Sequence, residues 1–198
     1  MHFREMTVKA PSVTTVLEIM SKGEGFLKWV GYRGYEATRK IADDAGLRGT
    51  KVHTAMASWI DSGVEVEGLA DDEKKMLDAG RAFLESIGHT HGKKGAKSEY
   101  IVHSRDGFNG QVDFFDGVDL LVDWKTSKEF REEFDIQTAA YMVAHNEQWP
   151  HRPALRRATV RLQADGEFKV KEYPRSADIP AYLAFLGLLK AFNWSHYN

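Results

Sequence analysis

The chain has 198 residues, of which 42% are hydrophobic and 28% are charged. This length and composition suit one folded domain with a sizeable core, and they exclude a disordered chain. The formal net charge of −2 argues against a protein that binds nucleic acid through bulk positive charge alone.

Three absences from the sequence narrow the classes of protein further. There is no cysteine, which excludes disulfides, zinc–thiolate sites and iron–sulfur clusters. No run of about 18 apolar residues occurs, so no membrane span is expected. The phosphate-cradling Gly-x-x-x-x-Gly-Lys loop is missing, so ATP is not an expected partner. The absence of cysteine fits a reducing compartment, and we expect the protein in the cytoplasm.

The first half of the chain is expected to be helical, to about residue 88. Ser12 stands before an apolar-periodic stretch and is a favourable N-cap for a short helix. Gly31 and Gly34 are expected to interrupt the second helical region, and Gly46 to close it. The helical segments expected here are 13–20, 25–45, 49–62 and 71–87.

After residue 95 the pattern changes to strands. Turn signals at Arg105-Asp106-Gly107, Asp116-Gly117 and Asp165-Gly166 separate apolar segments. The expected strands are 99–104, 110–115, 118–125, 157–163 and 167–173, and the expected helices are 134–148 and 179–192. This order predicts an α+β fold with a central mixed sheet flanked by helices. We expect a single domain over residues 1–198, with a helical N-terminal part at about 11–88 and a sheet-containing core at about 96–175.

Asp123 and Lys125 lie two apart on one predicted strand, and alternate residues of a strand share a face. Val122 and Trp124 point the other way, toward a buried layer. A carboxylate and an ammonium on one face can be an ordinary surface ion pair. Carboxylates also bind hard cations such as Mg²⁺ or Mn²⁺, and a metal-bound water can attack a phosphate. The pair alone leaves a structural and a catalytic role open.

Whether Asp113 can join this pair depends on the register of the hairpin between them. A two-residue turn at Asp116-Gly117 would place Asp113 opposite Leu120, on the face away from Asp123. A bulge or an odd-numbered loop centred near Val118 would place Asp113 opposite Asp123, with side-chain bases about 5 Å apart. One shared metal site requires the second register.

Four short blocks occur in order along the chain, each on an element suited to it. They are Gly49-x-x-x-His53, Gly110-x-x-Asp113, Asp123-x-Lys125 and Gln137-x-x-x-Tyr141. In these blocks the chain resembles the PD-(D/E)xK nucleases, specifically the RecB-like exonuclease group, over roughly residues 11–145. Some members of that group carry four cysteines for an iron–sulfur cluster, so this chain is similar only to the cluster-free branch.

The resemblance implies a restriction-endonuclease-like core and a role for each matched residue of the centre. His53, Asp113 and Asp123 would be metal ligands, and the Trp124 backbone carbonyl a possible further one. Lys125 would be the catalytic base or an electrostatic stabiliser. A lone histidine such as His53 is more often a partly buried polar residue on its helix.

Other residues are candidates for contacts with DNA. Gln137 and Tyr141 lie four apart on a helix and share a face, and the resemblance implies that they contact the nucleic-acid backbone or brace the site. Ordinary packing of the helix on the sheet is the alternative. Arg48 and Lys51 flank His53 and could contact phosphates.

Two further groups have an ordinary explanation as well as a functional one. Glu99, on the strand before Asp113, matches an acidic position in some relatives, but a solvated strand residue is the simpler interpretation. A basic stretch is either a DNA-facing rim or a solvated edge. It consists of Arg152, Arg156, Arg157 and Arg161.

The sequence therefore predicts a Mg²⁺- or Mn²⁺-dependent deoxyribonuclease, an exonuclease of DNA repair, recombination or phage replication. DNA is the expected partner, single-stranded or with free ends. The alternatives are a non-catalytic DNA-binding module that keeps the nuclease fold, and a structure-specific or RNA-directed endonuclease. The intact acid–acid–lysine set argues against the first alternative, because binding alone does not need that chemistry.

Overall fold

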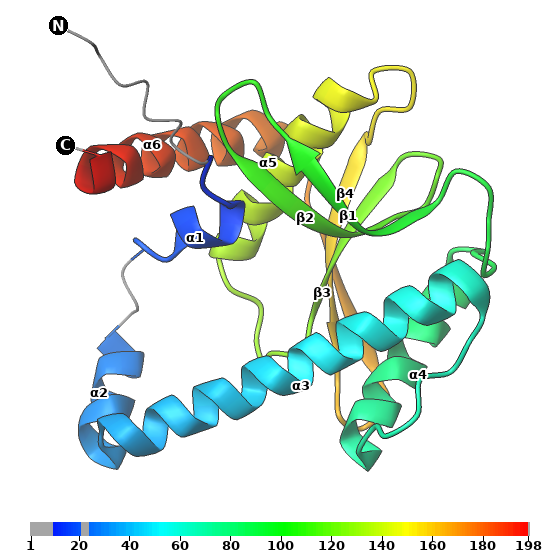
Figure 1. The fold of residues 1–198 in the computed structure, drawn as a ribbon, viewed down its shortest axis with the longest axis horizontal. Coiled ribbons are helices and arrows are strands. Elements are labelled where there is room, and N and C mark those ends of the chain that lie inside the picture. The colour runs from blue at the N-terminus through cyan, green and yellow to red at the C-terminus, as the bar shows by residue number, and fades with distance from the viewer. Residues whose placement is uncertain (1–9, 21–23, 198) are drawn as a thin grey trace, which may run out of the picture.

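The computed structural model describes residues 10–20 and 24–197, and within these ranges five strands form one mixed sheet (Figure 1). The strands lie side by side in chain order. They are β1 (Lys97–His103), β2 (Asn109–Phe115), β3 (Leu120–Lys125), β4 (Arg156–Leu162) and β5 (Phe168–Glu172). β3 and β4 run parallel, and every other neighbouring pair is antiparallel. The predicted α+β fold with a mixed central sheet is confirmed.

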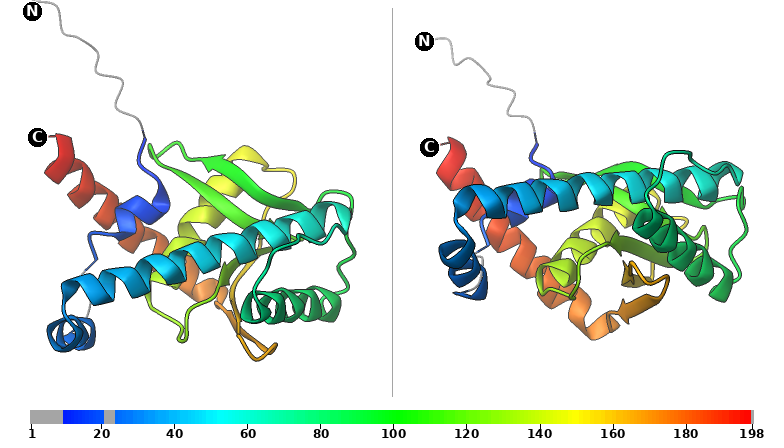
Figure 2. Two further views of the ribbon diagram at one scale, coloured as in Figure 1. Left: turned by 60° about the horizontal axis from the view of Figure 1, so that its bottom comes forward. Right: turned by 90° about the horizontal axis from the view of Figure 1, so that it is seen from below.

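Helices cover both faces of the sheet (Figure 2). They are α1 (Val13–Leu17), α2 (Glu24–Arg33), α3 (Tyr35–Ser62), α4 (Asp71–Ser86), α5 (Glu133–Gln148), a short 3₁₀ helix (Arg175–Ala177) and α6 (Asp178–Tyr197). α3 and α4 pack on one face, and α1, α5 and α6 on the other. None of the described helices is long and apolar enough to cross a membrane.

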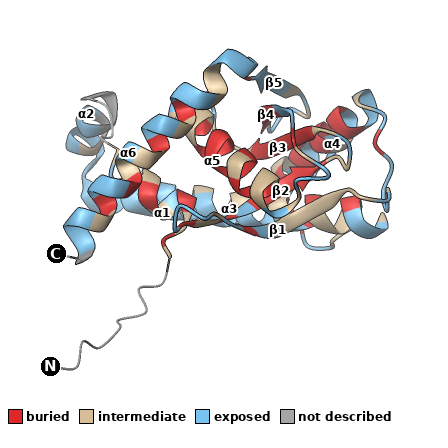
Figure 3. Cartoon of the chain, turned by 90° about the horizontal axis from the view of Figure 1, so that it is seen from above, coloured by how far each residue is buried: buried red, intermediate tan, exposed pale blue. Residues whose placement is uncertain are grey.

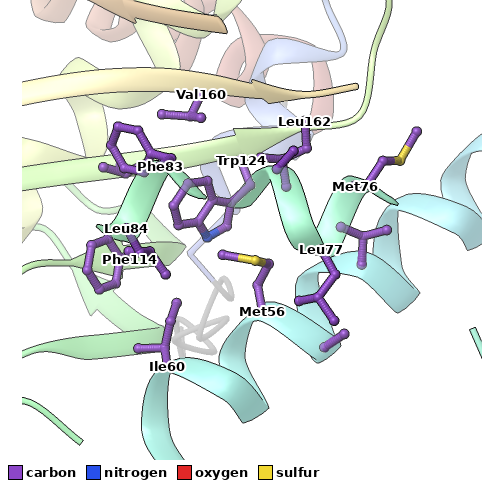
Figure 4. Close-up of a cluster of buried hydrophobic side chains, with 14 of the residues drawn as sticks. Met56, Ile60, Met76, Leu77, Phe83, Leu84, Phe114, Trp124, Val160 and Leu162 are labelled. Carbon is purple, nitrogen blue, oxygen red and sulfur yellow. The ribbon is translucent and has the colours of Figure 1, made fainter. Parts of the chain in front are cut away.

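The alternation of β3 divides its side chains between two cores. Leu120, Val122 and Trp124 belong to the core beneath α3 and α4, whereas Leu121 belongs to the core beneath α5 and α6. In the first core Trp124 lies edge-on to Phe83 with ring centroids 5.6 Å apart (Figure 4). Figure 3 shows the central strands buried between the two helical layers. Because Asp123 and Lys125 alternate with the first set, they point toward the α5 side.

The helix that carries His53 is longer than the sequence suggests. Gly46 was expected to end one helix and Gly49 to begin the next, but α3 runs through both as one helix of 28 residues. A glycine inside a helix costs roughly 1 kcal/mol relative to alanine, which weakens a helix without breaking it. The boundaries lie instead at Gly34 and Gly63, where φ is +84° and +70°. The N-terminal half of α3 extends beyond the sheet toward α2 (Figures 1 and 2).

The β2–β3 hairpin has the register that a shared site requires. Phe114 pairs with Val122 and Phe115 with Leu121, so the hairpin is centred on Val118 and places Asp113 across from Asp123. The loop is closed by a hydrogen bond that the Asp116 N–H donates to the Leu120 carbonyl, at 3.0 Å. This odd-numbered loop, rather than a two-residue turn at Asp116-Gly117, is the alternative predicted for a shared site.

Candidate active site

A cavity of about 410 Å³ lies where β1, β2 and β3 face α3 and α5. The acidic and basic side chains that line it come from four elements. They are His53 of α3, Glu99 of β1, Asp113 of β2, and Asp123 and Lys125 of β3. The structure thus brings His53, Asp113, Asp123 and Lys125 together, although they span more than 70 positions of the sequence. Such a concentration of charge in one cavity is typical of a functional site.

Asp113 is buried and holds β2 and β3 together at the point where their ladder stops. The recorded pairing ends at Phe114 and Val122, and beyond it Asp113 Oδ2 accepts a 2.7 Å hydrogen bond from the Trp124 N–H. The carboxylate thus replaces a strand carbonyl as acceptor, which satisfies a backbone donor that would otherwise be buried without a partner. Its other oxygen, Oδ1, lies 3.4 Å from His53 Nδ1 and remains directed into the cavity.

Asp123 and Lys125 form an ion pair on one face of β3, as their spacing predicts. Lys125 Nζ lies 2.8 Å from Asp123 Oδ2 and donates a hydrogen bond to Oδ1 at 3.0 Å. Only 1% of the Asp123 side chain is exposed, compared with 19% for Lys125. Burial raises the pKa of Asp123 to about 6, and Asp113 adds to this rise, while Lys125 opposes it. The ammonium of Lys125 is therefore the part of the pair that solvent reaches.

His53 lies between two carboxylates. Its Nδ1 is 3.4 Å from Asp113 Oδ1 and 3.5 Å from Glu99 Oε1. Burial by itself would lower the pKa of His53, but these two carboxylates outweigh it and raise the pKa to about 10. Burial would likewise raise the pKa of Asp113, yet His53, Lys125 and the Trp124 N–H hold it below its usual value. Without a bound cation, a protonated imidazole thus balances the acids of this side of the cavity.

Glu99 is the residue of the site that the sequence-based interpretation undervalued. It was taken as a solvated strand residue, but its side chain is only 25% exposed and faces His53. The signal was available in the turn at Arg105-Asp106-Gly107. A hairpin centred on Asp106 places Glu99 opposite Asp113. The structure has this register, because Ser98 pairs with Phe114 and Tyr100 pairs with Val112.

The two α5 residues of the last sequence block line the cavity and contact each other. Gln137 Nε2 donates a 2.9 Å hydrogen bond to the Tyr141 hydroxyl, and both side chains are buried. Burial, together with Asp123 and Asp113, raises the pKa of Tyr141 well above its usual value, so the phenol stays protonated. Tyr141 also explains Gly110, because a Cβ at that glycine would lie 2.5 Å from Tyr141 Cε1.

Three other candidate residues do not point into the cavity. Arg48 lies 3.6 Å from Asp72, and Lys51 lies 3.4 Å from Glu73, so both side chains reach toward α4. The Trp124 side chain is buried in the core under α3 and α4. Contacts of Arg48 and Lys51 with DNA, and of the Trp124 carbonyl with an ion, stay predictions.

The donor set of the cavity suits a hard divalent cation. Three residues, His53, Glu99 and Asp113, each offer one ligand atom, and these atoms lie within 4.8 Å of one another. Carboxylate oxygens are the ligands that Mg²⁺ prefers, and imidazole joins them for Mn²⁺ and similar ions. In addition, Glu99 Oε1 is shielded from solvent and accepts no hydrogen bond from the described residues. The residues present therefore fit a bound cation.

Solved structures similar to the chain include two exonucleases, while no protein-family model and no curated protein matches it. A proposed exonuclease from Eubacterium rectale has a TM-score of 0.49 and 14% identity, over 75% of this chain and 67% of that chain. The alkaline exonuclease LHK-Exo from Laribacter hongkongensis has a TM-score of 0.44 and 13% identity, over 91% of this chain and 88% of that chain. At this level of similarity, an activity has to be inferred from the residues of the cavity.

Proposed function

We propose that this protein is a metal-dependent nuclease that hydrolyses phosphodiester bonds in DNA. One observation carries the proposal. The β2–β3 register places Asp113 across from Asp123, and the same cavity receives Lys125 and His53. Two acids, a lysine and an imidazole in one cavity are what metal-assisted phosphodiester hydrolysis requires.

The roles follow from chemistry and position. His53, Asp113 and Asp123 would hold Mg²⁺ or Mn²⁺, with the Trp124 carbonyl as a further ligand. Such a cation, when bound, lowers the pKa of a bound water and neutralises charge on the phosphate. Lys125 presents its ammonium at the solvent side of Asp123, where it can stabilise negative charge on a phosphate oxygen. Its contact with Asp123 holds it in place.

The finer assignment is an exonuclease of the RecB-like PD-(D/E)xK group, acting in DNA repair, recombination or phage replication. It is supported by the four sequence blocks, because three of them contribute both of their named residues to one cavity and the first contributes His53. In this assignment Gln137 and Tyr141 contact the DNA backbone or brace the site, and Arg48 and Lys51 contact phosphates farther out.

The proposal is tested with end-labelled single- and double-stranded DNA in Mg²⁺, Mn²⁺ or EDTA. We expect cutting that EDTA abolishes and that Lys125→Ala reduces by about 100-fold or more, the usual effect of removing one stabilising group. The matched control is Lys75→Ala, because Lys75 is an exposed lysine of α4 that does not line the cavity. Uncut circular DNA beside trimmed linear DNA would identify an exonuclease.

Two results would contradict the proposal. One is no cutting of any substrate while DNA binding is unchanged in Lys125→Ala, which would favour a non-catalytic binding module. The other is cutting by Lys125→Ala at the rate of Lys75→Ala, which would place the activity outside this cavity.

A further inference from the structure

We infer that Glu99 is a metal ligand, and that with His53 and Asp113 it holds a divalent cation on the β1 side of Asp113. Asp123 and Lys125 occupy the opposite side, as an ion pair of their own. This inference deepens the proposed function and rests on it for the presence of a cation in the cavity. It also changes the ligand set, because the sequence blocks assign Asp123 rather than Glu99 to the ion.

The positions of three atoms carry the inference. His53 Nδ1 lies 3.4 Å from Asp113 Oδ1 and 3.5 Å from Glu99 Oε1, and each of the three residues offers a ligand atom within 4.8 Å of the other two. Ligand atoms that share an ion at about 2.1 Å lie about 3–4 Å apart. The same separations are too long for good hydrogen bonds. The three atoms therefore converge on one point without satisfying each other.

The two oxygens of Glu99 differ in a way that fits a ligand. Gln111 Nε2 donates a 2.5 Å hydrogen bond to Oε2, which fixes the carboxylate. Oε1 is shielded from solvent and has no hydrogen-bond donor among the described residues. A carboxylate oxygen buried in this way, next to the carboxylate of Asp113, is unfavourable unless a cation compensates it.

The backbone at Glu99 is arranged to deliver this side chain. Its φ is +43°, and within the described ranges it is the one non-glycine residue with positive φ. Glu99 is not part of the β1–β2 ladder, although its neighbours are: Ser98 pairs with Phe114, and Tyr100 pairs with Val112. A residue in a regular strand would alternate between the two faces, whereas this conformation turns Glu99 out of the ladder and toward His53.

Asp123 is compensated without an ion. Lys125 Nζ lies within 3.0 Å of both of its carboxylate oxygens. Among the described residues, Asp113 Oδ1 and Glu99 Oε1 have no lysine or arginine within ion-pair distance, and the one basic group at that distance is His53. Positive charge is therefore needed on the β1 side of Asp113 more than on the β3 side.

The test is Mn²⁺ binding by the full chain without DNA, measured by calorimetric titration and by the electron paramagnetic resonance signal of free Mn²⁺. We expect Glu99→Gln to weaken binding more than about tenfold, and Gln111→Ala, which releases the carboxylate, to weaken it by about tenfold. Asp123→Asn should remain closer to the natural chain than Glu99→Gln does. Glu67→Gln is the control, since it removes the same charge from an exposed residue.

A second variant guards against misfolding. Glu99→Gly accepts the positive φ without strain, so it should fold as the natural chain does while binding Mn²⁺ poorly. Equal Mn²⁺ affinity in Glu99→Gln and Glu67→Gln would overturn the inference, and so would a natural chain that binds no Mn²⁺. Metal-dependent DNA cutting, together with unchanged Mn²⁺ binding in Glu99→Gln, would contradict the role of Glu99 and leave the nuclease proposal supported. Mn²⁺ binding that depends on Glu99, without cutting of any DNA, would support the metal site and contradict the nuclease proposal.

Discussion

At the scale of single residues, the Asp113 carboxylate both lines the cavity and accepts a backbone hydrogen bond of the sheet. Asp113 accepts the Trp124 N–H at 2.7 Å where the strand ladder stops, and it offers its second oxygen to the cavity. A side chain with two tasks is held in one rotamer, which is what a site needs when ligand atoms must be pre-positioned. The same hydrogen bond ties the position of Asp113 to the strand that carries Asp123 and Lys125.

The raised pKa of His53 predicts a pH dependence of stability in EDTA. The pKa is about 10 in the folded chain and about 6.5 when unfolded, so the folded state binds the proton more tightly. The stabilisation is complete below pH 6.5 and is lost as the pH rises toward 10. Urea unfolding across this window should show a falling free energy of unfolding for the natural chain and a flatter course for His53→Asn. Equal slopes would mean that His53 is not held protonated by Asp113 and Glu99.

Gly110 predicts a steric effect at the site. A Cβ there would lie 2.5 Å from Cε1 and 2.8 Å from Cδ1 of Tyr141, a buried ring that Gln137 also holds. We expect Gly110→Ala to lower the free energy of unfolding by about 1–3 kcal/mol, as overpacking does. The control is Gly31→Ala, at an exposed position of α2 where a Cβ meets no described atom within 4 Å. Equal stability of the two variants in urea would show that Tyr141 moves freely.

At the scale of elements, two loops and one helix decide the geometry. The loop centred on Val118 and the turn centred on Asp106 set the two registers that bring Glu99, Asp113 and Asp123 into one row across β1, β2 and β3. A shift of one residue in either hairpin would turn its acid to the opposite face. The length of these loops is therefore part of the site.

The continuity of α3 predicts that Gly46 is dispensable. A Cβ there meets no described atom within 4 Å, and the helix passes through it. Gly46→Ala should raise the free energy of unfolding by about 0.5–1 kcal/mol, the usual difference in helix propensity. Gly34→Ala should lower it, because φ is +84° there. Thermal unfolding that ranked the two variants in the other order would place the helix boundary at Gly46.

At the scale of the whole molecule, a buried arginine joins β4 to both helices behind the sheet. Arg157 is 1% exposed and donates to Asp178 of α6 and Asp135 of α5, each at 2.7 Å. Its guanidinium also lies over the Tyr173 ring at 4.7 Å. The basic stretch that the sequence left as a rim or a solvated edge is therefore partly internal, because Arg161 is buried as well.

Two adjacent arginines make a matched test of this role. Arg157→Ala leaves two acids without their buried partner and should lower the free energy of unfolding by about 3–5 kcal/mol. Arg156→Ala removes an exposed ion pair with Glu172 and should cost no more than about 1 kcal/mol. Urea unfolding measures both. A similar loss in the two variants would show that Arg157 is not a structural centre of the fold.

The sequence by itself determined those features that depend on local period and on matched spacing. The alternation of β3 predicted the common face of Asp123 and Lys125, and the Val118-centred loop was one of two stated registers. Ser12 was predicted as the cap of α1, and its Oγ accepts the Thr15 N–H at 3.1 Å. Such features follow from a few neighbouring residues, so a pattern can predict them.

Only the tertiary structure decided which distant groups share an environment. The turn centred on Asp106 could have placed Glu99 opposite Asp113, but no local pattern shows that α3 crosses over β1 and brings His53 to 3.5 Å from Glu99. Arg157 looked like a surface charge because its two acids lie 22 and 21 residues away, on α5 and α6. Burial and charge compensation are set by which elements pack together, and that packing is the part of the free energy that no local pattern contains.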